Sequence, residues 1–434
     1  MQKSVAAAGH ERPAEVKQPE RPPLLQVLGP GLITGASDDD PSGIATYSQA
    51  GAQFGYNLGW TLLFTWPLMC AIQEISARIG RVTGHGLAGN LKRHYPWPIV
   101  LGLTGLLLIA NTINLAADLG AMGAAVRLLI GGPQFVWVAA FTIVSALMEI
   151  FLRYARYVGV LKWLTVSLFA YVAVAFAVRT PWATVGYHLV VPAMSLKAGY
   201  LTVVVAVLGT TISPYLFFWQ ASSEVDETRE TPEREPLLRA PEQAMPAFER
   251  IRLDTYLGMF FSNAVALFII IATAATLHAH GVNNIQTSSD AARALRPIAG
   301  NLAFLVFAMG IVGCGLLAVP VLAGSAAYAI GEMMGWRSSL AAKPTRARGF
   351  YLTIAGLFAA GLVLNLVRLD PVKALFWSAV VNGVVAVPVM VMIMHLASRG
   401  SAMGAFRLRP RLKIMGWLAT AAMAAAAAGM FATM

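Results

Sequence analysis

Charge is scarce in this sequence: Asp, Glu, Lys and Arg make up 12% of its 434 residues. That is about half the share that is usual in soluble globular domains. Hydrophobic residues reach 57%, and the mean hydropathy is +0.64. A chain with so few charges cannot cover a water-facing surface of ordinary composition, which excludes a soluble domain as its main body. The composition therefore predicts a protein whose principal solvent is lipid.

Cysteine and catalytic motifs are also scarce. The two cysteines, Cys70 and Cys314, each lie inside an apolar run, so we expect neither a disulfide framework nor a thiolate metal site. No His-Glu-x-x-His or Gly-x-Ser-x-Gly motif occurs, and nothing predicts an enzyme. Residues 1–23 are polar and lack the apolar stretch of a signal peptide. We interpret them as a cytoplasmic tail.

Long apolar runs are abundant. A helix needs about 20 such residues to cross the hydrocarbon of a bilayer. Eleven stretches are predicted to be transmembrane helices, so the fold class is an all-α integral membrane protein. They cover roughly 24–47, 57–80, 98–129, 133–152, 157–178, 199–222, 256–277, 297–331, 349–367, 371–397 and 412–433.

The basic residues set the expected orientation. With the N-terminus in the cytoplasm, 25 of the 32 Lys and Arg residues fall in the tail and the inward connections. The positive-inside rule then predicts an outer C-terminus, in a multi-pass protein of a cell membrane, typically the bacterial inner membrane. The formal charge of +11 belongs to these connections, so no nucleic-acid partner is expected. The charged connection 223–255 is predicted to be a solvated cytoplasmic linker.

Two spans are interrupted by polar residues. The first contains Asp38-Asp39-Asp40-Pro41-Ser42-Gly43, and the sixth contains Gly209-Thr210-Thr211 and Ser213-Pro214-Tyr215. A charge at this depth costs at least about 2.5–3.5 kcal/mol, so it indicates a functional site. Pro also frees backbone carbonyls in each span. Breaks at equivalent places in two five-span halves are typical of an inverted repeat that binds its substrate at the membrane midplane.

Both breaks offer hard oxygen ligands: carboxylate, hydroxyl and freed carbonyl groups. Such ligands suit Mg²⁺, Mn²⁺ and Ca²⁺, and an acidic pocket would repel an anion. A sodium-coupled carrier of an organic solute on a similar inverted repeat is an alternative. Its first helix would break at small residues able to accept a carboxylate, and three consecutive Asp residues argue against it.

Three segments carry a family resemblance. GPGLITGASDDDPSGIATYSQAGAQFGYNLGW, QEISARIGRVTGHGLA and ANTINLAADLGAMGAAV resemble the first span, the end of the second and the third span of the Nramp family of divalent metal transporters. The resemblance implies a LeuT-like fold in which 24–178 and 199–397 form the two repeats, with discontinuous first and sixth helices. An eleventh helix over 412–434 follows. It also implies a monomer in the lipid bilayer whose only metal is the transported cation.

The site motifs depart from those of the family. Its Asp-Pro-Gly-Asn corresponds to Asp40-Pro41-Ser42-Gly43, so Asp40 carries over as a metal ligand, while Gly43 replaces the Asn. Its Met-Pro-His corresponds to Ser213-Pro214-Tyr215, and Thr210 stands where a carbonyl coordinates the ion. A hydroxyl in place of a thioether favours harder ions. Gly43 is expected to enlarge the site, as suits a partly hydrated Mg²⁺. The pattern is similar to the Nramp-related magnesium transporters.

The third span bears on proton coupling. Asp118 matches the family's Asp, but Asn111 and Ala121 stand where the family has two Glu residues of a proton path. Neither can relay a proton, so we expect transport of Mg²⁺, with Mn²⁺ also accepted, without proton coupling. The alternative is a proton-coupled Mn²⁺/Fe²⁺ transporter.

Other polar residues are secondary candidates. Asp38 and Asp39 either line a cation-attracting vestibule, or one of them caps a half-helix N-terminus or pairs with a base; Asp39 is also a candidate ligand. Asn382 in the tenth span is either a ligand or an interhelical hydrogen-bonding group. Glu74 and Glu149 are predicted to form i,i+4 ion pairs with Arg78 and Arg153.

Overall fold

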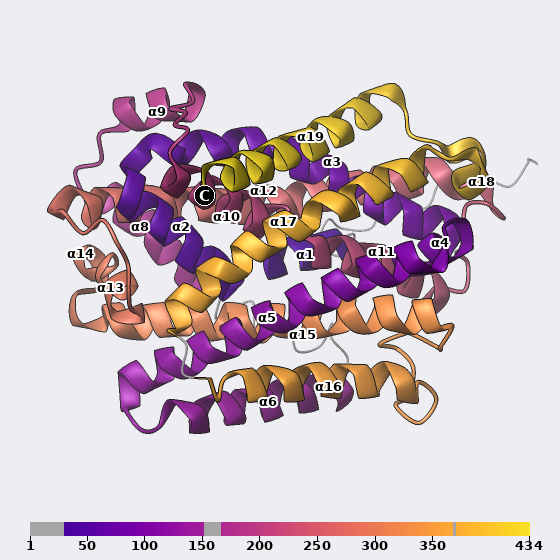
Figure 1. Ribbon diagram of the computed structural model, residues 1–434, viewed down its shortest axis with the longest axis horizontal. Coiled ribbons are helices and arrows are strands. Elements are labelled where there is room, and N and C mark those ends of the chain that lie inside the picture. Colours follow the sequence, from indigo (N-terminus) through magenta and orange to yellow (C-terminus); the bar gives the residue numbers. More distant parts are fainter. Residues whose placement is uncertain (1–29, 152–165, 368–369) are drawn as a thin grey trace, which may run out of the picture.

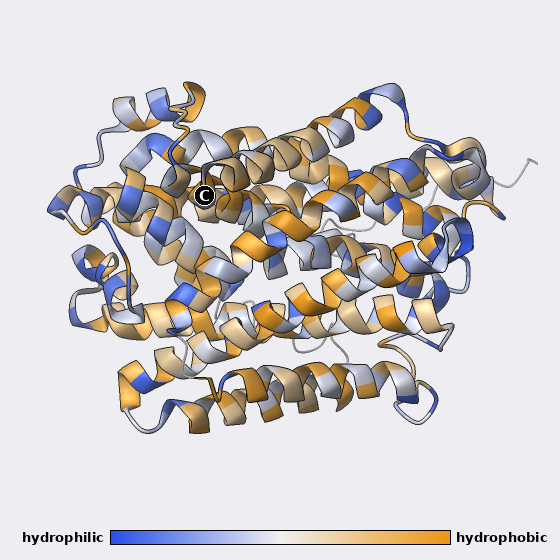
Figure 2. Ribbon diagram, in the orientation of Figure 1, coloured by the Kyte–Doolittle hydropathy of each residue, from blue (hydrophilic) through white to orange (hydrophobic). Residues whose placement is uncertain are grey.

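The computed structural model describes residues 30–151, 166–367 and 370–434, and every regular element within them is a helix (Figure 1). The long helices run along a common direction through the molecule. Hydrophobic residues cover most of their length, and hydrophilic residues gather towards their ends and in the connections (Figure 2). This distribution is the one that a bilayer imposes on a helical bundle.

Helices occupy all eleven predicted spans within the described residues. The first span is split into α1 (Pro30–Asp38) and α2 (Pro41–Phe54), and the sixth into α10 (Ala198–Thr211) and α11 (Pro214–Glu230). The others are α3 (Gly59–Thr83), α5 (Trp97–Ile130), α6 (Gln134–Phe151), α8 (Phe169–Ala177), α12 (Ala244–Thr276), α15 (Ala303–Met334), α16 (Arg348–Leu364), α17 (Pro371–Ser398) and α19 (Pro410–Thr433).

Length and composition alone qualify seven of the described helices as spans, or eight if one bent pair is counted. The pair is Val166–Ala177 and Trp182–Val190, which meet at 115°. The second member is α9 (Trp182–Val190), a helix in a stretch for which the sequence predicted no span. The first half of the fifth predicted span lies outside the described residues, and α16, with 17 residues, is shorter than the test requires.

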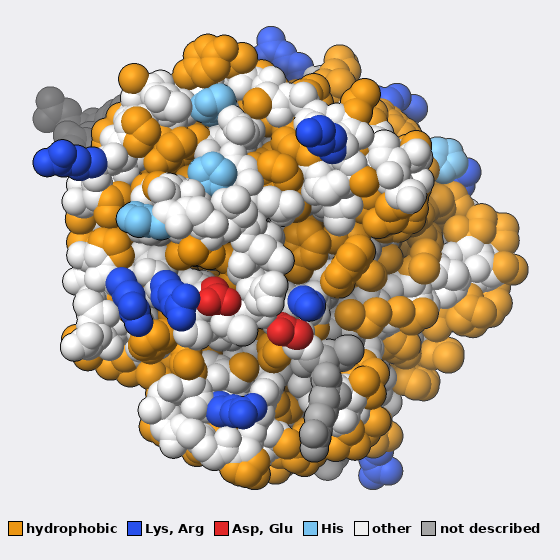
Figure 3. Space-filling view, turned by 60° about the vertical axis from the view of Figure 1, so that its left-hand side comes forward, with side chains coloured by type: hydrophobic (Ala, Val, Ile, Leu, Met, Phe, Trp, Pro, Cys, Tyr) orange, Lys and Arg blue, Asp and Glu red, His pale blue; other side chains and the backbone are white. Residues whose placement is uncertain are grey.

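Short elements cap the two ends of the bundle. They are η2 (Gly55–Leu58), α4 (Leu87–His94), η3 (Val166–Leu168), η4 (Pro241–Gln243), η5 (His278–His280), α13 (Ser288–Arg293), α14 (Arg296–Ala299), η6 (Gly300–Leu302), α18 (Gly400–Met403) and η7 (Gly404–Phe406). In Figure 1, α4 and α18 lie at the right-hand end, and α9, α13 and α14 lie at the left. Figure 3 brings the left-hand end forward, where basic side chains are scattered among polar groups and hydrophobic side chains cover the flank.

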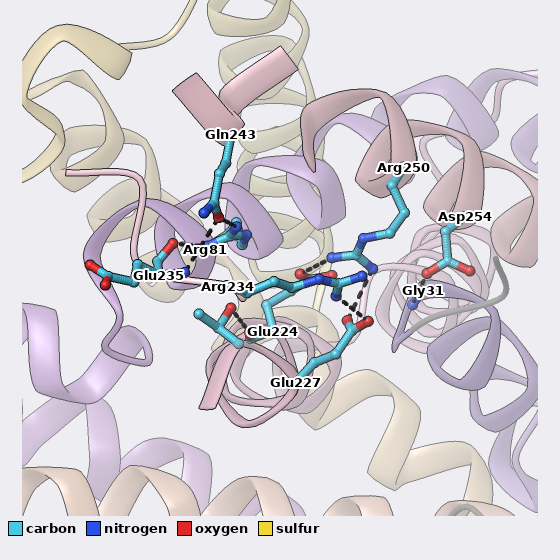
Figure 4. Close-up of polar contacts among 10 residues, drawn as sticks. Gly31, Arg81, Glu224, Glu227, Arg234, Glu235, Gln243, Arg250 and Asp254 are labelled. Atoms are coloured by element: carbon cyan, nitrogen blue, oxygen red, sulfur yellow. Dashed lines mark hydrogen bonds and ion pairs between the residues drawn. The ribbon is translucent and has the colours of Figure 1, made fainter. Parts of the chain in front are cut away.

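The connection after the sixth span differs from its prediction as a solvated linker over 223–255. α11 continues to Glu230 and α12 begins at Ala244, so only 231–243 joins them. The charges pair across this junction: Arg250 lies 2.5 Å from Glu224 and 3.1 Å from Glu227 (Figure 4). Arg250, Glu224 and Glu227 thus pair between the helix extensions, whereas most of the joining segment 231–243 stays exposed or half-buried.

Of the two predicted i,i+4 ion pairs, one is confirmed. Arg78 lies 2.5 Å from Glu74 within α3. Arg153 lies outside the described residues, so the second pair stays a prediction. Glu149 itself is buried, and its carboxylate lies beside Gly324 of α15.

The two broken helices lie at the centre of the bundle. α1 packs against α11 and α12, while α2 packs against α10, α12 and α17. α10 and α17 meet at Gly209, where any side chain would collide with the backbone of Ala379 and Gly383. Two glycines thus let the helix backbones approach closely, as membrane interfaces commonly require. The approach holds the second break against the tenth span.

Candidate functional site

Asp40 restarts the first broken helix. It lies in an extended conformation (φ −76°, ψ 169°) directly before Pro41, the first residue of α2. Its Oδ1 accepts hydrogen bonds from the Gly43 amide at 2.7 Å and the Ser42 hydroxyl at 2.6 Å. Asp is a favoured N-cap, and Pro is favoured at the first helical position. The Asp-Pro pair therefore ends one half-helix and begins the next.

The second oxygen of Asp40 faces the third span. Asn114 of α5 donates to Oδ2 at 3.0 Å, and Ser378 of α17 donates to the Asn114 carbonyl oxygen at 2.8 Å. Neither Asn114 nor Ser378 was among the residues predicted from the sequence. A signal was present for Asn114, because it precedes Asp118 by four residues and shares its helix face. One carboxylate thus joins three membrane helices.

Asp118 lies within this cluster and is fully buried. It lies within electrostatic reach of Asp40 and close to the Ser42 amide. Neither of its carboxylate oxygens makes a hydrogen bond of ordinary geometry with the described part of the chain. A buried carboxylate in this state indicates a place where an ion, a proton or water is held.

Asp38 and Asp39 both contact Ser262 of α12. The Ser262 hydroxyl lies 2.5 Å from Asp38 Oδ2 and 3.2 Å from Asp39 Oδ1. Asp39 is the more accessible of the two, at 8% exposed against 1%. Among the described residues, no three His, Cys, Asp or Glu side chains gather as metal ligands. A cation here would need hydroxyl, amide and carbonyl oxygens beside Asp40.

Ser213 caps the second broken helix. α10 ends at Thr211 and α11 begins at Pro214, with Ser213 extended between them. The Ser213 hydroxyl turns back and lies 2.8 Å from the Gly209 carbonyl oxygen and 3.0 Å from that of Thr210. It thereby satisfies carbonyls at the end of α10 that a continuous helix would have bonded.

The two breaks touch at Tyr215 and at Gly43. The Tyr215 hydroxyl donates to the Ser37 carbonyl at 3.2 Å, which ties α11 to α1. A Cβ atom on Gly43 would lie 3.1 Å from the Thr210 hydroxyl and 3.2 Å from the Tyr47 ring. The expectation that Gly43 enlarges the site is therefore wrong, because neighbouring side chains approach the space. Gly43 allows close contact between the breaks.

Asn382 and Asn111 differ in their surroundings. Asn382 of α17 is fully buried, and its side-chain nitrogen and oxygen bond to no group in the described ranges. It precedes Gly383, where α17 meets α10. Asn111 instead donates to the Leu322 carbonyl at 2.9 Å and the Ser325 hydroxyl at 2.8 Å. Asn382 thus keeps its polar atoms available, whereas Asn111 fastens α5 to α15.

Solved structures define the fold class of this arrangement. A manganese transporter of Eremococcus coleocola superposes with a TM-score of 0.73 at 17% identity, covering 95% of this chain and 88% of that one. Mhp1, a nucleobase-cation-symport-1 family transporter in a closed conformation, gives 0.57 at 13% identity, covering 94% and 92%. The predicted LeuT-like fold is confirmed.

The sequence comparisons then give the family. The family described as natural resistance-associated macrophage protein-like matches residues 31–433. Two relatives are both named divalent metal cation transporter MntH. The protein from Burkholderia ambifaria is 28% identical over 92% of this chain and 86% of its own length. The protein from Deinococcus radiodurans is 26% identical over 91% and 87%. The chain belongs to the Nramp family, and the resemblance seen in its motifs is confirmed.

Proposed function

We propose that this chain carries divalent metal cations across a membrane by alternating access, with the ion held where the two helix breaks meet. One observation carries the proposal. Asp40, at the break of the first span, lies beside the contact between Gly43 and Thr210 of the second break. A buried carboxylate between two interrupted helices is the arrangement that a midplane cation site requires. The names of the MntH relatives support it.

Mg²⁺ is the proposed preferred ion, with Mn²⁺ also accepted. The candidate donors are oxygens: the Asp40 carboxylate, the Thr210 and Ser213 hydroxyls and the Asn382 amide. Ser213 stands where the family motif has Met, so the thioether that attracts softer ions is replaced by a hydroxyl. Hard oxygen donors favour Mg²⁺ and Mn²⁺ over softer transition metals.

Transport is proposed to proceed without proton coupling. Asn111 and Ala121 stand at the two acidic positions of the family's third span, and the Asn111 amide is engaged with α15. Tyr215 replaces the family's His and binds a backbone carbonyl. The driving force is then the ion gradient and the membrane potential. A potential of 100 mV contributes about 2.3 kcal/mol per charge, or roughly 4.6 kcal/mol for a dication.

Reconstitution into liposomes tests these statements together. One vesicle population holds a Mg²⁺-sensitive dye and another holds a pH-sensitive dye, under an imposed potential that is negative inside. We expect saturable Mg²⁺ entry that Mn²⁺ inhibits and that leaves the internal pH unchanged. Absence of Mg²⁺ entry would refute the proposed ion, and acidification that follows metal entry would refute uncoupled transport.

A proton-coupled manganese transporter is the competing function. The name of the structural neighbour agrees with manganese as its ion, and the buried thiol of Cys314 is a soft group of the kind that transition metals accept more readily than Mg²⁺ does. It predicts Mn²⁺ entry with acidification and no competition by Mg²⁺. The liposome experiment separates the two, and a Cys314→Ser variant shows whether the thiol contributes to Mn²⁺ uptake.

The proposed topology has a cytoplasmic N-terminus and an outer C-terminus, in a monomer of a bacterial inner membrane. Both natural cysteines are buried, which limits their reaction with a thiol reagent. They are replaced for the experiment, and single reporter cysteines are introduced. Ser401→Cys is expected to react with a membrane-impermeant thiol reagent only from inside, and Gln286→Cys only from outside. The reversed pattern would overturn the orientation.

A further inference from the structure

A cavity of about 600 Å³ opens at the end of the bundle that carries α4. Four segments line it: the α3–α4 connection, α4, the end of α11, and the end of α15 with the turn that follows. Its ionisable lining residues are His85, Lys92, Arg93, Arg229, Glu332 and Arg337. None of them belongs to the site between the helix breaks. By the positive-inside rule this end is the cytoplasmic one.

Positive charge dominates the lining. Lys92, Arg93 and Arg337 are exposed, and none forms an ion pair with another described residue. Arg229 has one long contact, 3.8 Å to Asp226. Four cationic side chains therefore share the cavity with a single carboxylate, that of Glu332. Like charges gathered around a concave surface raise the local concentration of anions.

Glu332 offsets part of this positive charge but forms no ion pair with another described residue. Gly89 donates its amide to one oxygen at 2.9 Å, and the Ser222 hydroxyl donates to the other at 3.3 Å. Through these two hydrogen bonds, Glu332 of α15 links α4 and α11, and its side chain forms part of the cavity wall.

The pKa of His85 is lowered by its surroundings in the cavity. Burial, followed by the charges of Arg93, Arg229 and Arg239, lowers its pKa to about 4. The imidazole therefore stays neutral at physiological pH, where it can donate one hydrogen bond and accept another. Two of these arginines, Arg93 and Arg229, line the cavity with His85.

The rim of the cavity has a defined backbone. Gly335 ends α15 with φ +79°, a left-handed conformation that favours glycine, and the Trp336 amide bonds back to the Gly331 carbonyl at 2.7 Å. The ε-ammonium of Lys92 would lie 3.5 Å from a Cβ atom on Gly335, so α4 and this turn adjoin. The half-exposed Trp336 ring completes the rim.

We propose that this cavity binds a phosphate-bearing anion with two or more negative charges. Arg and Lys are the side chains that recognise phosphate, the volume lies within the usual range for ligand pockets, and a neutral His supplies a further donor. The phosphate can come from an anionic lipid headgroup at the membrane surface or from a soluble polyphosphate such as a nucleotide. Because the ligand would bridge α4, α11 and α15, its binding would also restrain the inner half of the sixth span. That last effect rests on the proposed transport function, whereas binding does not.

Binding is tested on the purified full chain without measuring transport. Thermal unfolding and Trp fluorescence are followed in two series, each metal-free and at constant ionic strength. One series adds pyrophosphate or ATP to protein in detergent. The other compares nanodiscs of phosphatidylcholine with nanodiscs that also contain cardiolipin. We expect a saturable rise in unfolding temperature in at least one series, and the responding series identifies the source of the phosphate.

Matched variants separate the cavity from general surface charge. Arg93→Gln combined with Arg337→Gln should weaken binding at least 10-fold, and Lys92→Gln should weaken it less. All three side chains are exposed, so folding should be preserved. Arg411→Gln combined with Lys413→Gln removes two exposed charges outside the cavity and should leave binding unchanged. No response in either series, or equal loss in both double variants, would overturn the proposal.

Discussion

Asp40 is proposed both to cap a helix and to bind the ion, and these two roles can be separated with Asp370. Both residues are N-caps that precede Pro, and in each case one carboxylate oxygen accepts from a backbone amide of the first turn. Asp370 caps α17 through the amides of Val372 at 2.9 Å and Lys373 at 3.3 Å. Only Asp40 also lies between the two helix breaks. Asp370 is therefore a matched control for the loss of a cap.

The expected losses of stability follow from the hydrogen bonds. Replacing an Asp N-cap with Ala costs about 1 kcal/mol, which is the whole effect expected for Asp370→Ala. Asp40→Ala also leaves the buried amide of Asn114 without its acceptor, which adds about 1–3 kcal/mol. Asp40→Asn retains an oxygen that can accept from Gly43 and Ser42, but its amide nitrogen replaces the Oδ2 that accepts from Asn114, so it should cost about 1–3 kcal/mol. It keeps the helix cap and removes the charge together with one hydrogen bond.

The four single variants, Asn and Ala at each position, are compared by thermal unfolding in detergent and by Mg²⁺ uptake into liposomes. Both Asp370 variants should transport at near the natural rate. Both Asp40 variants should lose at least about 100-fold in apparent affinity, equivalent to about 2.7 kcal/mol. Asp40→Asn is decisive, because it should fold and yet lose this affinity. Uptake by Asp40→Asn at the natural rate and affinity would remove Asp40 from the ion site.

Three further predictions concern coupling, selectivity and folding. Asn111→Glu restores an acid in the third span, and metal entry should then acidify liposomes that hold a pH dye; unchanged pH would show that this position alone does not decide coupling. Ser213→Met restores a thioether, so the ratio of Mn²⁺ to Mg²⁺ uptake in competition assays should rise about 10-fold, and a constant ratio would exclude Ser213 from selection. Arg250→Met leaves the buried Glu224 without its partner and should cost about 3–5 kcal/mol in denaturant unfolding, whereas Glu227→Gln, at a half-buried side chain, should cost less than about 1 kcal/mol. Equal losses in these two variants would contradict the role given to the buried pair.

The fold was largely predictable because the bilayer imposes one rule on every span. Each backbone polar group must bond within its own helix, so apolar length locates most of the helices. α5, predicted over 98–129, runs from Trp97 to Ile130. Apolar length does not predict the structure of segments that lie in water instead of lipid. Beyond the sixth span, Arg250 pairs with Glu224 and Glu227 of α11, but the composition of this segment is equally that of a solvated linker.

The site was predictable in part. Asp40 and Pro41 can be recognised from the sequence, because a carboxylate and a helix breaker are costly inside a membrane. Asn114 and Ser378 do not, because an isolated Asn or Ser in a span is as common in helix packing as in ligand binding. The position of Gly43 was misread for another reason. The absence of a side chain suggests free space at Gly43, but the Thr210 hydroxyl of the second helix break lies close to the Gly43 backbone.

The buried polar atoms at this site carry an energetic cost that binding of an ion offsets. Thr210, Asn382 and Asp118 have buried side-chain atoms that make no hydrogen bond of ordinary geometry with the described residues. Each such atom in a low-dielectric interior costs about 1–3 kcal/mol, and more if it is charged. Apolar residues at these places would make the fold more stable. This cost is offset only when a ligand binds the polar atoms. A hydrated or partly hydrated dication supplies both charge and hydrogen-bond donors. On this reasoning, binding of the proposed ion should stabilise the natural protein in unfolding experiments and leave Asp40→Asn almost unaffected, so that site occupancy can be measured without transport.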